Sequence, residues 1–295
     1  MLLSRAVTPL LAVSLLATSS EPTATVPPPR AVVAYRPNGR LIALPVRING
    51  SPARWFVLDS GAPHTVIDAA VAKQSRLQVL STDSGAGAGR GSYALRHLAP
   101  VDLAIGSLRL RVSTPVAIDL RNTGMQDPAA GLVGADVFRR YVVRIDPIAR
   151  TVAFYDPATY ACPPTAAVVA LTSPADRLYV DMTLTVNGTS VVRRMRIDTG
   201  SEDAASDNLV RRSTERRRSL QGVGLGTPYV DYSGVFDSLR IGPYVIHHAW
   251  GASNDRPAVG MEILRRFTST FDVPAGRLCL EPNAYLREAV PAPPR

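Results

Sequence analysis

Short apolar runs separated by turn-forming residues recur along the whole sequence, and long amphipathic helical patterns are absent. The runs are rich in Val, Ile, Leu, Tyr and Arg, and Gly, Pro, Asn and Asp punctuate them, which is typical of many short β-strands. Leu41–Ile48 and Tyr179–Val186 are two such runs. Each is followed directly by an Asn-Gly pair, which favours a tight hairpin turn. The pattern therefore predicts an all-β fold.

The two halves of the sequence repeat one order of elements. Each half has a strand, an Asn-Gly turn, a second strand, an Asp-Ser/Thr-Gly tripeptide, a glycine-rich region, an apolar-apolar-Gly triplet and a short helical segment. The tripeptides are Asp59-Ser60-Gly61 and Asp198-Thr199-Gly200, the triplets are Leu132-Val133-Gly134 and Ala258-Val259-Gly260, and the helical segments are residues 135–140 and 261–266. Repetition in this order indicates two copies of one structural unit.

An Asp-Ser/Thr-Gly tripeptide alone is a weak signal, because roughly one chain in ten of this length contains it by chance. A third copy, Asp83-Ser84-Gly85, follows polar residues rather than an apolar strand, and we interpret it as a loop without a catalytic role. The informative signal is therefore the repeated context of Asp59 and Asp198.

Composition and charge narrow the class of protein. The chain has 295 residues, of which 46% are hydrophobic and 19% are charged, as in a folded globular protein. The net charge of +9 comes almost entirely from arginine, and the arginines are scattered apart from a cluster within residues 211–218. No DNA-binding motif or aromatic interleaving accompanies the cluster, so we expect no nucleic-acid partner and interpret the cluster as a solvated loop.

The N-terminus has the order of a signal peptide. Met1–Arg5 carries one positive charge, Ala6–Ala17 is apolar, and small residues follow, which predicts a signal peptide over residues 1–20. The apolar segment is short for spanning a bilayer, so we expect cleavage and an exported protein, periplasmic or secreted, with no membrane association afterwards. An uncleaved anchor is the alternative. Residues 21–34 contain three successive prolines and are predicted to form an extended tether.

The repeat and the proline content predict the domain boundaries. We expect an N-terminal lobe at 35–156, a Pro-rich linker at 157–174, a C-terminal lobe at 175–286 and a disordered tail at 287–295. A strand over residues 168–171 within the linker stays open. Cys162 lies in the linker and Cys279 in the last predicted strand. They either form a disulfide, which an oxidising compartment would favour, or remain buried free thiols.

The matched contexts of the two tripeptides resemble the retropepsin/pepsin-type aspartic proteases. In that family each lobe contributes a hydrophobic-Asp-Ser/Thr-Gly loop, and a later apolar-apolar-Gly segment crosses beneath it. The resemblance covers about residues 35–283, and the short lobes look like two fused retroviral-type subunits. It implies a bilobal pepsin-like fold of two similar β-barrel-like lobes with short helices, in which one chain forms the whole site as a monomer.

The resemblance also implies the activity and the site. The chain would be an aspartic endopeptidase acting on a peptide or protein substrate, with Asp59 and Asp198 sharing one proton and activating a water. The supporting loop residues would be Ser60, Gly61, Thr199 and Gly200, with the hydroxyls bracing the loops and the glycines allowing close approach. Neither a cofactor nor a metal is implied.

A hairpin flap closes over the substrate in this family, and glycine-rich segments exist in both halves. Gly85–Tyr93 and Gly222–Tyr232 are the candidates, with Tyr93 and Tyr232 as candidate flap aromatics and ordinary loop tyrosines as the alternative. The sequence leaves open which lobe supplies the flap.

The sequence departs from the family pattern at one place, and two alternative functions accompany this interpretation. Glu202, Asp203 and Asp207 follow the second tripeptide, where the family usually has small or apolar residues, and they either raise the pKa values of the dyad or are solvated. A non-catalytic peptide-binding protein on the same two-lobed fold is the alternative function. A metal-dependent hydrolase is disfavoured because the histidines lack ligand spacing, at His64, His97, His247 and His248.

Overall fold

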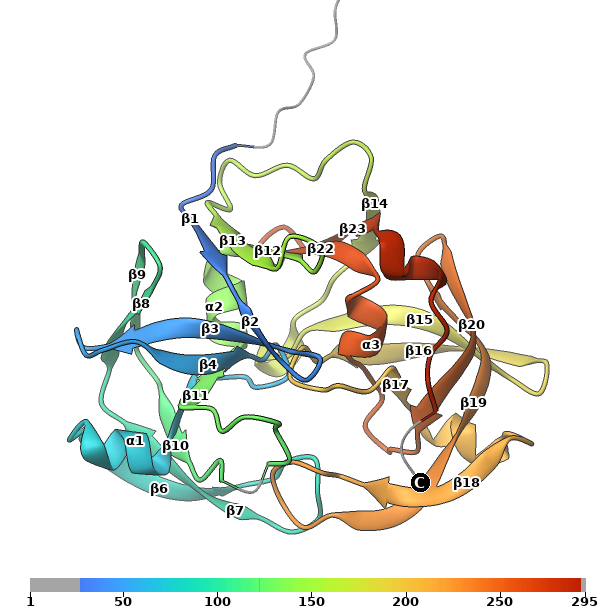
Figure 1. Cartoon of the computed structure of the whole chain (residues 1–295), viewed down its shortest axis with the longest axis horizontal. Coiled ribbons are helices and arrows are strands. Elements are labelled where there is room, and N and C mark those ends of the chain that lie inside the picture. The colour runs from blue at the N-terminus through green and yellow to red at the C-terminus, as the bar shows by residue number, and fades with distance from the viewer. Residues whose placement is uncertain (1–26, 122, 293–295) are drawn as a thin grey trace, which may run out of the picture.

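A computed structural model describes residues 27–121 and 123–292, and nearly all of its regular structure is β-strand (Figure 1). The predicted all-β class is confirmed. The helices are α1 (Ala69–Gln74), α2 (Ala135–Arg140) and α3 (Met261–Leu264), with the 3₁₀ segments η1 (Pro174–Asp176), η2 (Asn208–Arg212) and η3 (Ala284–Arg287). None of these helices is long and apolar enough to span a membrane. The predicted signal peptide and residues 21–26 of the tether lie outside the described residues.

The first half forms a ten-stranded sheet in the order β6-β7-β10-β5-β11-β4-β3-β8-β9, with β2 paired to β3. Its strands are β2 (Arg36–Asn38), β3 (Leu41–Ile48), β4 (Arg54–Leu58), β5 (Val66–Asp68), β6 (Val79–Gly85), β7 (Tyr93–Leu98), β8 (Val101–Ile105), β9 (Leu108–Val112), β10 (Val116–Ile118) and β11 (Gly131–Val133). Side chains alternate between buried and exposed along β9, as expected for a strand with one face on the core.

The second half forms a seven-stranded sheet in the order β15-β16-β21-β17-β20-β19-β18. Its strands are β15 (Tyr179–Val186), β16 (Thr189–Ile197), β17 (Ala205–Ser206), β18 (Arg216–Gln221), β19 (Tyr229–Ile241), β20 (Tyr244–Ala252) and β21 (Ala258–Val259). The predicted Asn-Gly turns join β3 to β4 and β15 to β16, and all of their Asn and Gly residues have positive φ. The prediction of a solvated loop at the arginine cluster is wrong, because residues 216–218 pair with β19 as part of β18.

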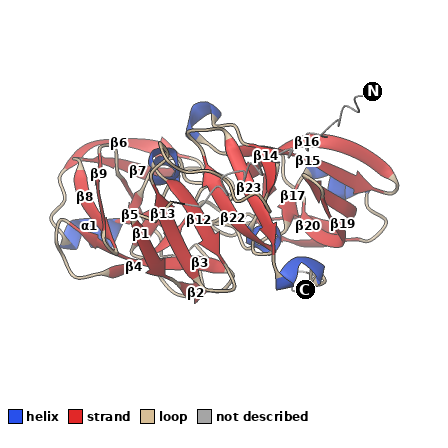
Figure 2. Ribbon diagram, turned by 90° about the horizontal axis from the view of Figure 1, so that it is seen from above, coloured by secondary structure: helices blue, strands red, loops and turns tan. Residues whose placement is uncertain are grey.

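A six-stranded sheet joins the two halves in the order β1-β13-β12-β22-β23-β14 (Figure 2). Its strands are β1 (Ala31–Ala34), β12 (Val142–Asp146), β13 (Thr151–Tyr155), β14 (Ala167–Ala170), β22 (Phe267–Asp272) and β23 (Arg277–Pro282). The halves meet where β12 runs antiparallel to β22. Phe138 of α2 packs edge-on against Phe271 of β22, with 5.2 Å between the centres of the two rings. The buried core is therefore continuous across the junction.

The structural repeat extends beyond the elements that the sequence predicts as repeated. Strands β1 and β14 both read Ala-Val-Val-Ala, and they pair in equivalent positions with β13 and β23. The predicted tether is therefore wrong for residues 31–34, which form a strand because Ala31 and Val33 are buried on the joining sheet. The strand left open within the linker exists as β14.

The predicted disordered tail is wrong at its beginning. Arg266 is fully buried, and its guanidinium donates hydrogen bonds to the backbone carbonyls of Tyr285 and Leu286 at 3.2 Å. Arg265 forms an ion pair with Glu288, and Val290 is 4% exposed. These contacts hold the chain against α3 through residue 290, because the buried guanidinium, which also bonds to Glu262, takes its remaining acceptors from this segment.

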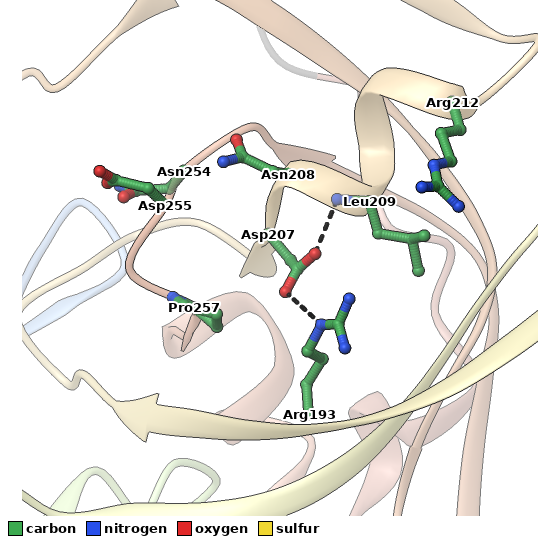
Figure 3. A pocket seen from close by; sticks show the side chains of 8 residues that line it. All are labelled: Arg193, Asp207, Asn208, Leu209, Arg212, Asn254, Asp255 and Pro257. Atoms are coloured by element: carbon green, nitrogen blue, oxygen red, sulfur yellow. Dashed lines mark hydrogen bonds and ion pairs between the residues drawn. The ribbon is translucent and has the colours of Figure 1, made fainter.

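A polar surface cavity of about 310 Å³ lies in the second half (Figure 3). Its lining consists of Arg193, Asp207, Asn208, Leu209, Arg212, Asn254, Asp255 and Pro257. Asp207 caps η2 by accepting from the Leu209 N–H at 2.7 Å and also accepts from Arg193 at 3.1 Å. Asp207, one of the acidic residues flagged in the sequence, therefore has a structural partner on each side.

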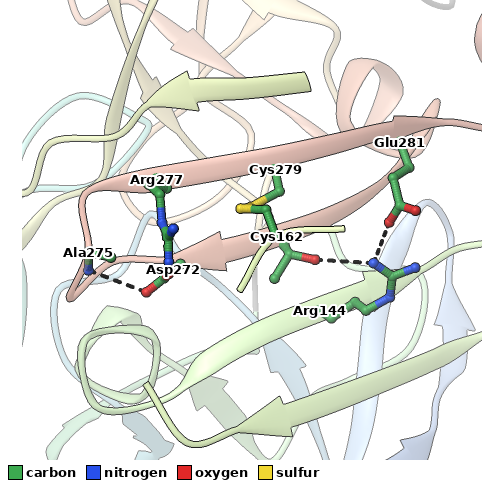
Figure 4. Close-up of a disulfide and its surroundings, with 8 residues drawn as sticks. Arg144, Cys162, Asp272, Ala275, Arg277, Cys279 and Glu281 are labelled. Atoms are coloured by element: carbon green, nitrogen blue, oxygen red, sulfur yellow. Dashed lines mark hydrogen bonds and ion pairs between the residues drawn. A yellow bond between two sulfur atoms is a disulfide. The ribbon is translucent and has the colours of Figure 1, made fainter. Parts of the chain in front are cut away.

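Cys162 and Cys279 form a disulfide between residues 117 apart in the sequence (Figure 4). Of the two states predicted for the cysteine pair, the structure contains the disulfide. The bond ties the segment that leaves the first half to β23 of the joining sheet.

Candidate active site

Each repeated aspartate follows the buried end of a strand, β4 in the first half and β16 in the second. The Asp59 N–H donates to the carbonyl of Val133, and the Asp198 N–H donates to the carbonyl of Val259, both at 2.9 Å. Strand β11 runs parallel to β4, and β21 runs parallel to β16. The apolar-apolar-Gly triplets therefore lie beside the aspartate loops, in the same way in both halves.

The two aspartate loops meet at the boundary between the halves. A Cβ atom added to Gly61 would lie 2.4 Å from Oδ1 of Asp198, and one added to Gly200 would lie 2.4 Å from Cγ of Asp59. Each carboxyl group thus lies against the glycine of the opposite loop. Only glycine leaves room for this approach, and it brings the two carboxyl groups close enough for their charges to interact.

The hydroxyls of Ser60 and Thr199 fasten the two loops together. The Ser60 N–H donates to Oγ1 of Thr199 at 2.9 Å, and the Thr199 N–H donates to Oγ of Ser60 at 3.0 Å. Each hydroxyl donates in turn to a carbonyl of the opposite strand, Ser60 to Ile197 at 2.9 Å and Thr199 to Leu58 at 2.7 Å. Both side chains are fully buried, so these four hydrogen bonds are shielded from water.

Replacing the hydroxyl of Thr199 should destabilise the whole molecule. Thr199→Val keeps the shape but leaves the Ser60 N–H and the Leu58 carbonyl without their buried partners, which costs about 1–3 kcal/mol per group. We expect the free energy of unfolding in guanidinium chloride to fall by about 2–4 kcal/mol. Thr189→Val, on the exposed start of β16, is the matched control and should change it little. An equal, small effect of both variants would contradict this role of the hydroxyls.

The environment of Asp59 favours its protonated form. Burial, and next the charge of Asp198, raise the pKa of Asp59 to about 7. The N–H groups of Gly61 and Ala62 donate to Oδ1 of Asp59 at 2.8 and 3.2 Å and oppose the shift only in part. The carboxyl group of Asp59 therefore keeps its proton to higher pH than an exposed aspartate does.

The site predicted from the sequence lacks an arginine that lies next to the two aspartates. Nη2 of Arg196 donates to Oδ2 of Asp198 at 2.6 Å, while the Gly200 N–H donates to Oδ1 at 3.1 Å. A comparison of the two repeats could have revealed Arg196, because an apolar residue, Val57, occupies the equivalent position in the first half. Arg177 is a second arginine at the site, and its guanidinium donates to the carbonyl of Gly61 at 3.0 Å.

The acidic residues Glu202 and Asp203, which follow the second tripeptide, have different surroundings. Glu202 accepts a hydrogen bond from the Arg40 N–H at 3.3 Å and so contacts the β2–β3 turn of the first half. Burial, then the charges of Asp198 and Glu202, raise the pKa of Asp203, whose side chain still reaches solvent. The pKa shift of Asp59 comes from burial and Asp198 rather than from these acidic residues.

The two glycine-rich hairpins meet at their tips. Hairpin β6–β7 turns at residues 86–92, hairpin β18–β19 turns at residues 222–228, and the two approach each other at the lower edge of Figure 1. The Arg90 N–H donates to the carbonyl of Thr227 and the Thr227 N–H donates to that of Arg90, both at 2.8 Å. The structure therefore brings the two candidate flap hairpins into contact with each other.

The two candidate flap tyrosines differ in position. Burial, and to a smaller extent the charge of Asp59, raise the pKa of Tyr93. Its hydroxyl donates to the carbonyl of Ala86 in the same hairpin at 3.4 Å. Tyr232 instead lies beside Arg216, whose guanidinium is 5.8 Å from the ring centre, and its N–H donates to the hydroxyl of Ser253.

The third tripeptide copy lies in a different setting from the other two. It belongs to strand β6 rather than to a loop, because β7 pairs with it, so that part of the interpretation is wrong. The Asp83 side chain is 66% exposed and lies 2.9 Å from Nε2 of His97. Among the described residues, no group of three or more His, Cys, Asp or Glu side chains could hold a metal ion.

Comparison with known families agrees with this geometry. Residues 44–137 match a family model described as aspartyl protease. The matched span starts in β3 and ends in α2, so it contains the Asp59 loop and the triplet beside it. No curated protein matches the chain. Residues 44–137 are therefore similar to the aspartyl protease family, in agreement with the resemblance that the sequence carries.

Proposed function

We propose that this protein is an aspartic endopeptidase in which Asp59 and Asp198 together activate a water molecule. The observation that carries the proposal is the contact of each carboxyl group with the glycine of the opposite loop. Two carboxyl groups held in this way share one proton, because ionising both would place like charges side by side in a partly buried site.

The proposed reaction needs only these two groups and water. The ionised carboxylate takes a proton from the water while the water oxygen attacks the carbonyl carbon of the scissile amide. The protonated carboxyl group gives its proton to the carbonyl oxygen, which forms a tetrahedral diol. Collapse of the diol breaks the C–N bond, and the amine leaves with a proton returned by the pair. No covalent enzyme intermediate forms.

The substrate would be a peptide or protein segment in extended conformation between the aspartate loops and the paired hairpin tips. The tips are joined by hydrogen bonds between residues 89–90 and 225–227, so they must separate to admit a polypeptide. Because one chain supplies both loops, we propose a monomer. Export to the periplasm or medium is also a proposal, which the disulfide supports because such bonds persist in oxidising compartments.

The test is a cleavage assay with a denatured protein mixture, from about pH 3 to 8. We expect cleavage that a statine-type transition-state mimic blocks and that chelators leave unchanged. Activity should fall as pH rises through about 7, because Asp59 then loses the proton that the reaction requires. Activity that keeps rising above that pH, or that chelators abolish, would contradict the mechanism. Saturable peptide binding without cleavage would favour the non-catalytic alternative.

A further inference from the structure

The two halves differ at one position next to the aspartate pair. Val57 and Arg196 both lie two residues before their aspartate. Val57 is buried in β4 opposite Leu132 of β11, whereas Arg196 lies in β16 opposite Ala258 of β21. An apolar Val–Leu pair in one repeat is thus replaced by an Arg–Ala pair in the other. The small alanine leaves space for the guanidinium, so the symmetry of the repeat is broken at the site itself.

The replacement gives the two carboxyl groups different hydrogen-bond partners. Both oxygens of Asp198 accept from N–H donors, Oδ1 from Gly200 at 3.1 Å and Oδ2 from Arg196 at 2.6 Å. In Asp59 only Oδ1 accepts, from Gly61 and Ala62. Within residues 27–121 and 123–292, no protein donor reaches Oδ2 of Asp59. That oxygen is therefore the one that can carry a proton without losing a bond.

The ion pair is partly shielded from solvent. The side chains of Arg196 and Asp198 are 24% and 13% exposed, so the charge-assisted hydrogen bond between them is stronger than a surface pair would be. Protonation of Asp198 would leave the partly shielded guanidinium of Arg196 without its counter-charge.

Other charged groups around the pair do not replace Arg196. Arg177 approaches from the start of the second half but bonds to the carbonyl of Gly61. Glu202 and Asp203 follow Asp198 on the same loop, and as carboxylates they offer no hydrogen-bond donor to it. Tyr93 of β7 is a neutral phenol at the relevant pH, because its pKa is raised above the ordinary value. In the described part of the chain, Arg196 alone donates a side-chain hydrogen bond to either aspartate.

We propose that Arg196 is a positioning residue that fixes the negative charge of the pair on Asp198, so that Asp59 is the acid that protonates the substrate carbonyl. This inference rests on the proposed function. It assigns distinct roles to two carboxyl groups that the repeated sequence makes look equivalent. The ionised Asp198 is then the base that takes the proton from water.

The proposal is tested first in the unaltered protein by ¹³C NMR titration of the aspartate side-chain carboxyl carbons, assigned with Asp59→Asn and Asp198→Asn. We expect Asp198 to ionise at lower pH than Asp59. The reverse order would overturn the proposal. Because this measurement needs no turnover, an inactive protein with the expected order would refute the proposed peptidase function while leaving the assignment of the charge intact.

The second test compares Arg196→Met, Arg196→Lys and the control Arg194→Met. Arg194 lies on the same strand but bonds to Thr172 and stacks on Tyr179. In Arg196→Met the first ionisation, and with it the acid limb of kcat/KM, should move up by about 1–3 pH units. Arg196→Lys should restore part of the shift, and Arg194→Met should show none. An unmoved acid limb in a folded Arg196→Met, or an equal shift in Arg194→Met, would overturn the proposal.

Discussion

Asp59→Asn is expected to abolish peptide hydrolysis without disturbing the fold. Asparagine keeps the shape of the side chain, and its carbonyl oxygen can still accept from the N–H groups of Gly61 and Ala62. It cannot supply the proton that the scissile carbonyl needs, and loss of general acid–base catalysis costs about 10²–10⁴-fold in rate. We therefore expect kcat/KM to fall by at least about 10³-fold, measured as peptide cleavage by the purified protein.

The stability of the same variant should depend less on pH between the unfolded pKa of 3.8 and the folded pKa of about 7. The pKa of Asp59 is raised from 3.8 to about 7 in the folded protein. Its contribution to stability is therefore complete below the unfolded value and is lost as pH rises through about 7. The loss amounts to about 4 kcal/mol at most. Asp59→Asn stays neutral, so its free energy of unfolding should change less than that of the unaltered protein between mildly acidic and mildly alkaline pH.

Two further variants control the experiment. Asp198→Asn should be as inactive as Asp59→Asn, because the base is then missing. Asp83→Asn makes the same change in the third Asp-Ser-Gly copy, whose side chain is exposed and bonded to His97, and it should retain full activity. Full cleavage by Asp59→Asn or by Asp198→Asn would refute the pair as the catalytic groups.

Removal of the disulfide is expected to have the largest effect on stability. The bond between Cys162 and Cys279 closes a loop of 117 residues. In the chain-entropy account, a loop of that size restricts the unfolded state by about 4–5 kcal/mol. We expect the Cys162→Ala/Cys279→Ala double variant to lose a similar amount in guanidinium chloride unfolding, with the joining sheet affected because β23 belongs to it.

The controls separate the bond from the side chains. Each single cysteine-to-alanine variant should be destabilised as much as the double variant, because either change removes the bond. The unaltered protein under reducing conditions should behave in the same way. If reduction left the free energy of unfolding unchanged, the bond would contribute nothing to the stability of the folded state.

Much of the fold could be predicted because its signals are local. Alternating apolar residues and Asn-Gly pairs specify strands and hairpins within ten residues or so, and the Asn49 and Asn187 turns form as expected. The errors concern segments whose state depends on distant partners. Residues 31–34 are a strand because β13 lies beside them, and residues 216–218 are a strand because β19 does. A short or charged segment gives no local sign of such a partner.

The candidate site likewise has features with a local sequence signal and features that depend on distant partners. The repeated loop can be recognised in the sequence, because a carboxyl group, a hydroxyl and a glycine must be adjacent in the chain, as Asp59-Ser60-Gly61 and Asp198-Thr199-Gly200 are. The surroundings of the loops depend instead on tertiary contacts. The fold brings Arg177 to Gly61, joins the hairpin tips of the two halves and pairs Cys162 with Cys279. Such contacts join residues about a hundred or more positions apart, and they form only when both sheets have folded and their faces have met.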